Sequence, residues 1–107
     1  MAWRQRHYIL NEAGEPEPTE DLVAWVWWCA THDEQRRLAV AELPGGVEVS
    51  TIFTGIDSGW GSGAPVLWET MVFGLTGEIR QWRYRSRQDA ERGHGRIVAA
   101  LQRGEEV

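Results

Sequence analysis

The stretch LAVAELPGGVEVSTIFTG, residues 38–55, decides the fold. Two runs rich in apolar residues, 38–43 and 47–55, flank the turn signal Pro44-Gly45-Gly46, and this pattern predicts an antiparallel hairpin. The second run alternates in character: Val47, Val49, Thr51 and Phe53 fall on one face, and Glu48, Ser50, Ile52 and Thr54 on the other. We therefore expect one face of this strand to pack on a core while the other faces water.

Further strands are predicted on both sides of the hairpin. Towards the C-terminus they cover residues 66–73 and 79–85, with Thr76-Gly77 in the turn, and a short strand covers residues 7–10. The run 66–73 alternates less, which is typical of a central strand covered on both faces. The segment Glu15-Pro16-Glu17-Pro18 is expected to lack regular structure, because its prolines interrupt helices and strands.

A helix is predicted over residues 20–31. Thr19 precedes it as the expected N-cap, and Glu20 and Asp21 supply negative charge at its positive end. The face expected to meet the core consists of Leu22, Trp25, Val26, Cys29 and Ala30.

A second helix is predicted from Ser86 to about Gln102. Ser86 has Asp89 three residues on, which resembles a capping box, and Gly104 follows the helix as a stop signal. Its apolar stripe is Ala90, His94, Ile97, Val98 and Leu101, while Arg92, Arg96 and Arg103 point away.

The expected order is β-α-β-β-β-β-α. Tight turns between the strands, with helices at the ends of the series, indicate an α+β fold: an antiparallel sheet of four to five strands with two helices packed on it. With 107 residues, the chain is expected to form one domain, residues 1–107.

Composition argues against several classes of protein. The formal net charge is -5, so general attraction to nucleic acid or to an anionic membrane is not expected. The single cysteine, Cys29, excludes an internal disulfide, and His7 and His32 have no partner at a metal-ligand spacing. No run approaches the roughly 20 apolar residues of a membrane span. We predict a cytoplasmic protein with no cofactor and no metal.

Tryptophan is the most unusual component of the chain. There are seven tryptophans, and Trp27 and Trp28 flank the expected core stripe of the first helix. Trp60 lies in a glycine-rich connection. Exposed aromatic residues at this density mark contact surfaces, so Trp27, Trp28 and Trp60 are the predicted partner-binding residues. The partner is a macromolecule or a second copy of the chain, and symmetric self-association is the commoner outcome.

The connection from Gly55 to Pro65 is too long for a minimal hairpin. Asp57, Gly59, Gly61 and Gly63 are its candidate functional residues. Successive glycine amides can form an anion site, and Asp57 can instead bind a cation. The segment lacks the lysine and the strand-to-helix context of a phosphate-binding loop, so a loop that contacts a partner is the favoured interpretation.

Arginine alternates with aromatic residues near the C-terminus. Trp82 and Tyr84 share one face of the predicted strand, and Arg83 and Arg85 the other. This pattern occurs in proteins that bind single-stranded nucleic acid. Inward aromatic residues with a solvated arginine face are favoured here because the chain is acidic, and Arg83 and Arg85 remain candidates for binding a small anion.

The residues that most often carry catalysis have ordinary structural explanations. His94 lies on a core stripe, where an imidazole bonded to the backbone is expected, and Cys29 is expected to be an inert core thiol. Glu69 is the one acid expected to be partly buried, and the sequence places no second carboxylate or base beside it. We predict that the protein is not an enzyme.

Two stretches resemble a family of small uncharacterised proteins of tailed phages and prophages. Residues 50–57 carry a STxFxGxD string, and residues 68–74 carry WETMxFG. The resemblance spans most of the chain, but Ser58 stands where many relatives have histidine, and Trp60 where phenylalanine is usual. It implies an accessory protein made in the cytoplasm of an infected bacterium, and it implies no catalytic residue.

The leading functional prediction is a non-enzymatic binding protein, homo-oligomeric, that contacts a host or phage macromolecule through its tryptophan-rich surface. The alternative is an anti-defence protein that sequesters a nucleotide signalling molecule. The glycine-rich loop and the arginines would then hold phosphate, and a tryptophan would stack on the base.

Overall fold

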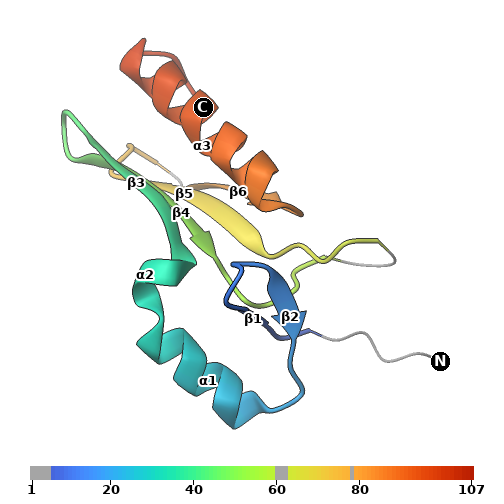
Figure 1. The fold of residues 1–107 in the computed structure, drawn as a ribbon. Coiled ribbons are helices and arrows are strands. Elements are labelled where there is room, and N and C mark those ends of the chain that lie inside the picture. Colours follow the sequence, from blue (N-terminus) through green and yellow to red (C-terminus); the bar gives the residue numbers. More distant parts are fainter. Residues whose placement is uncertain (1–5, 60–62, 78) are drawn as a thin grey trace.

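The structure, a computed structural model, describes residues 6–59, 63–77 and 79–107 (Figure 1). Its strands are β1 (Tyr8–Leu10), β2 (Pro16–Pro18), β3 (Arg37–Leu43), β4 (Val47–Phe53), β5 (Trp68–Phe73) and β6 (Arg80–Tyr84). Its helices are α1 (Leu22–Thr31), α2 (Asp33–Arg36) and α3 (Arg87–Gln102). The predicted α+β class is confirmed.

Four strands form one antiparallel sheet in the order β3-β4-β5-β6, and α3 lies across one of its faces (Figure 1). The alternation predicted for β4 is confirmed, because Val49, Thr51 and Phe53 are buried while Ser50 and Ile52 on the opposite face are partly exposed. Register pairs Thr51 of β4 with Thr70 of β5, which places both under the helix.

The prediction that residues 66–73 are covered on both faces is wrong. Trp68, Thr70 and Val72 are buried, but Phe73 on the opposite face is exposed, and Glu69 and Met71 are only half-buried. β5 is one of two inner strands, and its outer face combines apolar side chains with a carboxylate. Its weak alternation therefore reflects apolar residues at partly exposed positions.

Two groups of buried side chains make the core. The first contains Trp28, Phe53, Leu67, Trp68 and Ala90, and the second contains Val49, Val72 and Ile97. Full burial of a side chain of this size contributes about 1.5–3 kcal/mol to stability. The first group joins α1 and α3 to the sheet, so the two long helices are linked through the ends of β4 and β5.

The predicted C-terminal helix is confirmed together with its cap. The Ser86 side chain accepts a hydrogen bond from the amide of Asp89 at 3.1 Å, and Gly104 has a φ of +77° just after the last turn. Ala90 and Ile97 are buried, while His94, Val98 and Leu101 are half-buried. The amphipathic pattern of this helix decided its orientation on the sheet.

The N-terminal segment differs from expectation. Residues 16–18 pair with β1 instead of lacking structure, with Ile9 opposite Glu17 at the centre. Both strands of a two-stranded sheet are edge strands. Proline is tolerated in such a strand because the N–H that it lacks can be one that would face away from the partner strand. The side chain of Asn11 accepts hydrogen bonds from the amides of Ala13 and Glu15, at 2.9 and 3.0 Å, and so stabilises the turn.

The start of the first helix also differs. Asp21, not Thr19, is the N-cap, and its carboxylate accepts from the amide of Ala24 at 3.0 Å. Thr19 instead accepts from the amide of Asp21 at 3.3 Å. The short helix α2, which the sequence did not predict, connects α1 to β3.

Candidate functional site

The side of α1 that faces the core matches the predicted one only in part, because Trp25 and Cys29 are half-buried there while the rest of the predicted set is exposed. Trp28 is only 8% exposed, and its ring meets Phe53 edge to face at 6.0 Å and stacks on His32 at 4.8 Å. Trp25 is half-buried, and its indole N–H donates to the carbonyl oxygens of Tyr8 and Gly55, both at 3.1 Å. The prediction that Trp28 lies outside the core is therefore wrong.

Because α1 does not pack through the whole of its predicted core side, four large apolar side chains are exposed to water. They are Leu22, Val23, Val26 and Trp27, exposed by 56, 80, 53 and 64%. The prediction that Leu22 and Val26 belong to the core is wrong, and Ala30 is exposed as well. Trp27 is exposed as expected. These four residues form the exposed face of α1.

The glycine-rich connection is organised by Asp57. This carboxylate is 1% exposed, and its Oδ1 accepts hydrogen bonds from the amides of Gly59 and Val66, both at 2.9 Å. A side chain at Gly59 would come within 2.8 Å of Val66. The Gly59 amide already serves the protein's own carboxylate, which argues against an anion cradle there, and the buried Oδ1 is committed to the loop.

The other candidate residues of this connection are not brought to a common site. Gly63 has a φ of +107° and lies at the exposed end of the loop, which explains the glycine by conformation alone. Trp60 and Gly61 lie outside the described residues.

Arginines from two elements lie near the edge of the sheet, but Arg83 pairs with Glu69 on the face away from α3 and does not meet the arginines of the helix. The predicted Arg83 and Arg85 belong to β6 and the residue after it, and they line a pocket of about 480 Å³ with Arg92 and Arg96 of α3. Arg83 Nε lies 3.7 Å from Glu69 Oε1, and Arg85 donates to the carbonyl of Ala64. Arg92 and Arg96 were not among the candidate residues predicted from the sequence. Their spacing of one helical turn, on a solvent-facing side of α3, is the pattern that could have indicated them.

A polar network lies beneath α3. His94 Nδ1 is 2.8 Å from Thr51 Oγ1, which is 2.5 Å from Thr70 Oγ1, and the Tyr84 hydroxyl donates to Thr70 at 3.1 Å. The expected bond from His94 to the backbone is replaced by this side-chain contact. Burial lowers the pKa of His94 below its ordinary value. The network satisfies polar groups inside the core, as buried hydroxyls require.

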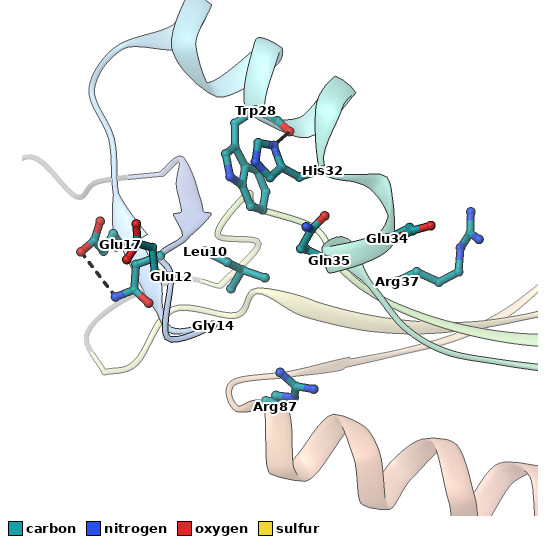
Figure 2. Close-up of a pocket in the computed structure, with 11 residues that line it drawn as sticks. Leu10, Glu12, Gly14, Glu17, Trp28, His32, Glu34, Gln35, Arg37 and Arg87 are labelled. Atoms are coloured by element: carbon teal, nitrogen blue, oxygen red, sulfur yellow. Dashed lines mark hydrogen bonds between the residues drawn. The ribbon is translucent and has the colours of Figure 1, made fainter.

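A larger groove of about 670 Å³ lies between the turn after β1, the α1–α2 junction and the start of α3 (Figure 2). Trp28 and His32 form its wall, and His32 Nδ1 is 2.8 Å from the Trp28 carbonyl. Its arginines are paired, Arg37 of β3 with Asp33 of α2 at 2.9 Å and Arg87 with Glu91 within α3 at 3.0 Å. Glutamates and arginines share the lining, so the groove does not favour a ligand of one charge.

Cys29 packs beside the first core group, and burial raises the pKa of its thiol, although the nearby Arg36 acts in the opposite direction. Within residues 6–59, 63–77 and 79–107, no cluster of three His, Cys, Asp or Glu side chains is arranged to hold a metal ion. In the same ranges no helix has the length and apolar character needed to cross a membrane.

Comparison with protein-family models, with curated proteins and with solved structures finds no match to this chain. The exposed face of α1 is a surface with a clear chemical bias, because its four exposed residues are all large and apolar.

Proposed function

We propose that the protein is a non-enzymatic binding protein that associates with a second copy of itself through the exposed face of α1. The observation that carries the proposal is the exposure of Leu22, Val23, Val26 and Trp27 on one helix. Contiguous apolar surface in contact with water is unfavourable and marks an interaction site. Tryptophan is also the residue type most enriched among those that dominate binding energy.

The spacing of these residues suits helix-to-helix packing. Leu22, Val26 and Ala30 form one row of residues four apart, and Val23 and Trp27 begin a second row. Rows of this kind interdigitate with the same rows of another helix. In an antiparallel pair with its two-fold axis midway between residues 26 and 27, Trp27 meets Val26 of the second copy, and Val23 meets Ala30. Each larger side chain then faces a smaller one.

Charge favours a second copy as the occupant. Residues 22–31 contain no charged side chain, so two molecules of net charge -5 can meet there without opposing like charges. A helix of this length is about 15 Å long and covers less than the roughly 800 Å² that each partner buries in a standard interface. The expected dimer is therefore weak, with a dissociation constant of roughly micromolar order.

The test is sedimentation velocity over a concentration series of the wild-type protein and the variant V23S/W27S. The wild type should shift from monomer to dimer as concentration rises, and the variant should remain monomeric. Ile79→Ser is the matched control, because Ile79 is a 58% exposed apolar residue outside α1 and should leave dimerisation unchanged. Circular dichroism of each variant checks that the fold persists.

Two results would contradict the proposal. A wild type that stays monomeric up to about 500 µM, far above micromolar affinity, shows that a second copy is not the occupant. Dimerisation that survives V23S/W27S shows that another surface is used. In the first case, a foreign macromolecule becomes the candidate for the exposed face of α1.

The cellular setting is part of the same proposal. The strings STxFxGxD and WETMxFG support an accessory phage protein that acts in the cytoplasm of an infected bacterium on a host or phage macromolecule. A dimer presents two copies of every surface to such a target, which strengthens binding by raising effective concentration.

A further inference from the structure

We propose that the face of the four-stranded sheet opposite α3 binds an amphipathic basic helix of another protein. In the part of the chain that the structure describes, α3 is the helix that contacts all four strands, and it lies across the other face (Figure 1). The outer face is formed by the strand residues that alternate with the buried ones. The inference goes beyond the proposed dimer and does not depend on it, because α1 is not part of this sheet.

Four apolar side chains lie together on the outer face. The register places Ser50 of β4 between Val40 of β3 and Met71 of β5. Ile52 follows Ser50 on the same face, and Phe73 follows Met71. Val40 and Phe73 are 44 and 38% exposed, and Ile52 and Met71 are half-buried. Apolar surface around one small serine leaves a place where the apolar side of another molecule can pack.

Two carboxylates on the same face lack a cation. Glu42 of β3 lies directly opposite Glu48 of β4, and Glu48 in turn lies opposite Phe73. Like charges in directly opposite positions repel each other. Among the described residues neither glutamate forms an ion pair, whereas Glu69 on the same face is paired with Arg83. An occupant that brings positive charge beside the apolar group relieves this repulsion.

The geometry of the face selects the form of the partner. Strands inside a sheet already use their backbone groups, so an occupant of the face packs through its side chains. Four strands are about 15 Å across, at roughly 4.8 Å between neighbours, and a helix of about ten residues spans this width. The apolar stripe of such a helix packs on the four apolar residues, and its flanking lysines or arginines reach Glu42 and Glu48. A second copy of this chain is disfavoured, because it brings the same two carboxylates and a net charge of -5.

The experiment is isothermal titration of the full chain with a basic amphipathic peptide, two repeats of Leu-Lys-Lys-Leu-Leu-Lys-Leu, at about 50 mM salt, where surface charges are weakly screened. One matched peptide carries glutamate in place of every lysine, and the other carries serine in place of every leucine. The basic amphipathic peptide should bind with a dissociation constant of roughly 100 µM or tighter, and both matched peptides at least about tenfold more weakly.

Two double variants of the protein locate the bound peptide. E42Q/E48Q should weaken its binding at least about threefold, since exposed ion pairs contribute modestly. V40S/F73S should weaken it about tenfold or more, because the apolar contact is lost. A protein that binds the peptide equally well after both changes uses another surface, which overturns the proposal.

The matched control for the change in charge is E12Q/E15Q. It removes two carboxylates from exposed positions in the turn after β1, outside the four-stranded sheet, and should bind the peptide as the wild type does. Circular dichroism should show that every variant remains folded. E42Q/E48Q in particular should keep its fold, because it relieves a repulsion between neighbouring strands.

Three further results would overturn the proposal. Absence of binding at about 1 mM peptide, far above the expected dissociation constant, shows that the face takes no such helix. Equal weakening by the charge variant and its control reduces the effect to overall charge. Binding that is lost in V23S/W27S but kept in V40S/F73S assigns the peptide to the exposed face of α1.

Discussion

Burial of His94 ties the stability of the fold to pH. Tyr84 donates to Thr70, and a consistent series of donors then runs from Thr70 to Thr51 and from Thr51 to His94 Nδ1. In this arrangement, the imidazole is neutral and carries its hydrogen on Nε2. A second proton on Nδ1 would remove the acceptor on which this series ends, and burial already disfavours the charged ring.

We therefore expect the free energy of unfolding to fall as the pH drops below about 6.5. The unfolded chain takes up a proton at the ordinary histidine pKa, while the folded protein, whose His94 pKa is lowered, does so only at a lower pH. The loss of stability begins near the pKa of histidine in the unfolded chain and levels off below the pKa of His94 in the folded protein. Urea unfolding at pH 7.5 and 5.5 measures it.

His94→Gln is the control for this effect. His7 and His32 are present in both proteins, so the difference between wild type and variant isolates residue 94. The variant should lose less stability than the wild type between the two pH values. Equal losses would contradict a buried neutral imidazole.

Two glycines of α3 should respond in opposite ways to alanine. At Gly93, an added Cβ would lie 2.3 Å from the Tyr84 hydroxyl oxygen, and that ring is held against the sheet by its bond to Thr70. Overpacking of this kind costs about 1–3 kcal/mol, which exceeds the gain in helix propensity. Gly93→Ala should lower the free energy of unfolding.

At Gly95 no atom lies within 4 Å of the added Cβ. Gly95→Ala should raise the free energy of unfolding by up to about 1 kcal/mol through helix propensity alone. Thermal and urea unfolding of the two variants provide the comparison. A stabilised Gly93→Ala would show that Tyr84 does not pack closely beneath α3.

At the scale of elements, the loop from residue 55 to residue 67 depends on one carboxylate. Asp57 joins the amides of Gly59 and Val66, so the two ends of the loop are fastened by the same buried oxygen. The amide of Asp57 also donates to the carbonyl of Arg6 at 2.8 Å, which links the N-terminal segment to this point.

Asp57→Ala should lower the free energy of unfolding by about 2–4 kcal/mol, since hydrogen bonds to charged groups contribute about 1.5–3 kcal/mol each. Ser58→Ala is the matched control, because Ser58 is an exposed neighbour and should change stability by less than about 0.5 kcal/mol. Denaturant unfolding measures both. If the two variants prove equally stable, the hydrogen bonds of Asp57 do not fasten the loop.

The composition of α1 explains why its buried side could not be predicted from the sequence. Every residue from Leu22 to Ala30 is apolar, so the sequence offers no polar side to turn towards water. Buried Trp28 and half-buried Trp25 and Cys29 follow helical spacing just as well as the expected set does. Packing chose between them, because the Trp28 ring fits against Phe53 and Trp25 finds two carbonyl acceptors.

At the scale of the whole molecule, α1 and α3 are packed to different extents. α3 spans the sheet, while α1 contacts mainly β1 and α2 at one end (Figure 1). The radius of gyration is 15.1 Å, above the roughly 13 Å of a compact chain of this length. One side of α1 is uncovered in this elongated arrangement.

By itself the sequence determined the features in which polar and apolar residues alternate. The inward face of β4, the orientation of α3 and its Ser86 cap, and the alternation of Trp82 and Tyr84 with arginines all follow from local periodicity. Residues on one face recur every two positions in a strand and every three to four in a helix, so a short window of sequence contains the information.

Only the tertiary structure decided the features that depend on distant partners. It turned Trp28 inward and Val23 outward, paired residues 16–18 with β1, and gave His94 a threonine partner. The physical reason is common to all of them: burial and pairing depend on which surfaces meet, and no local periodicity records that.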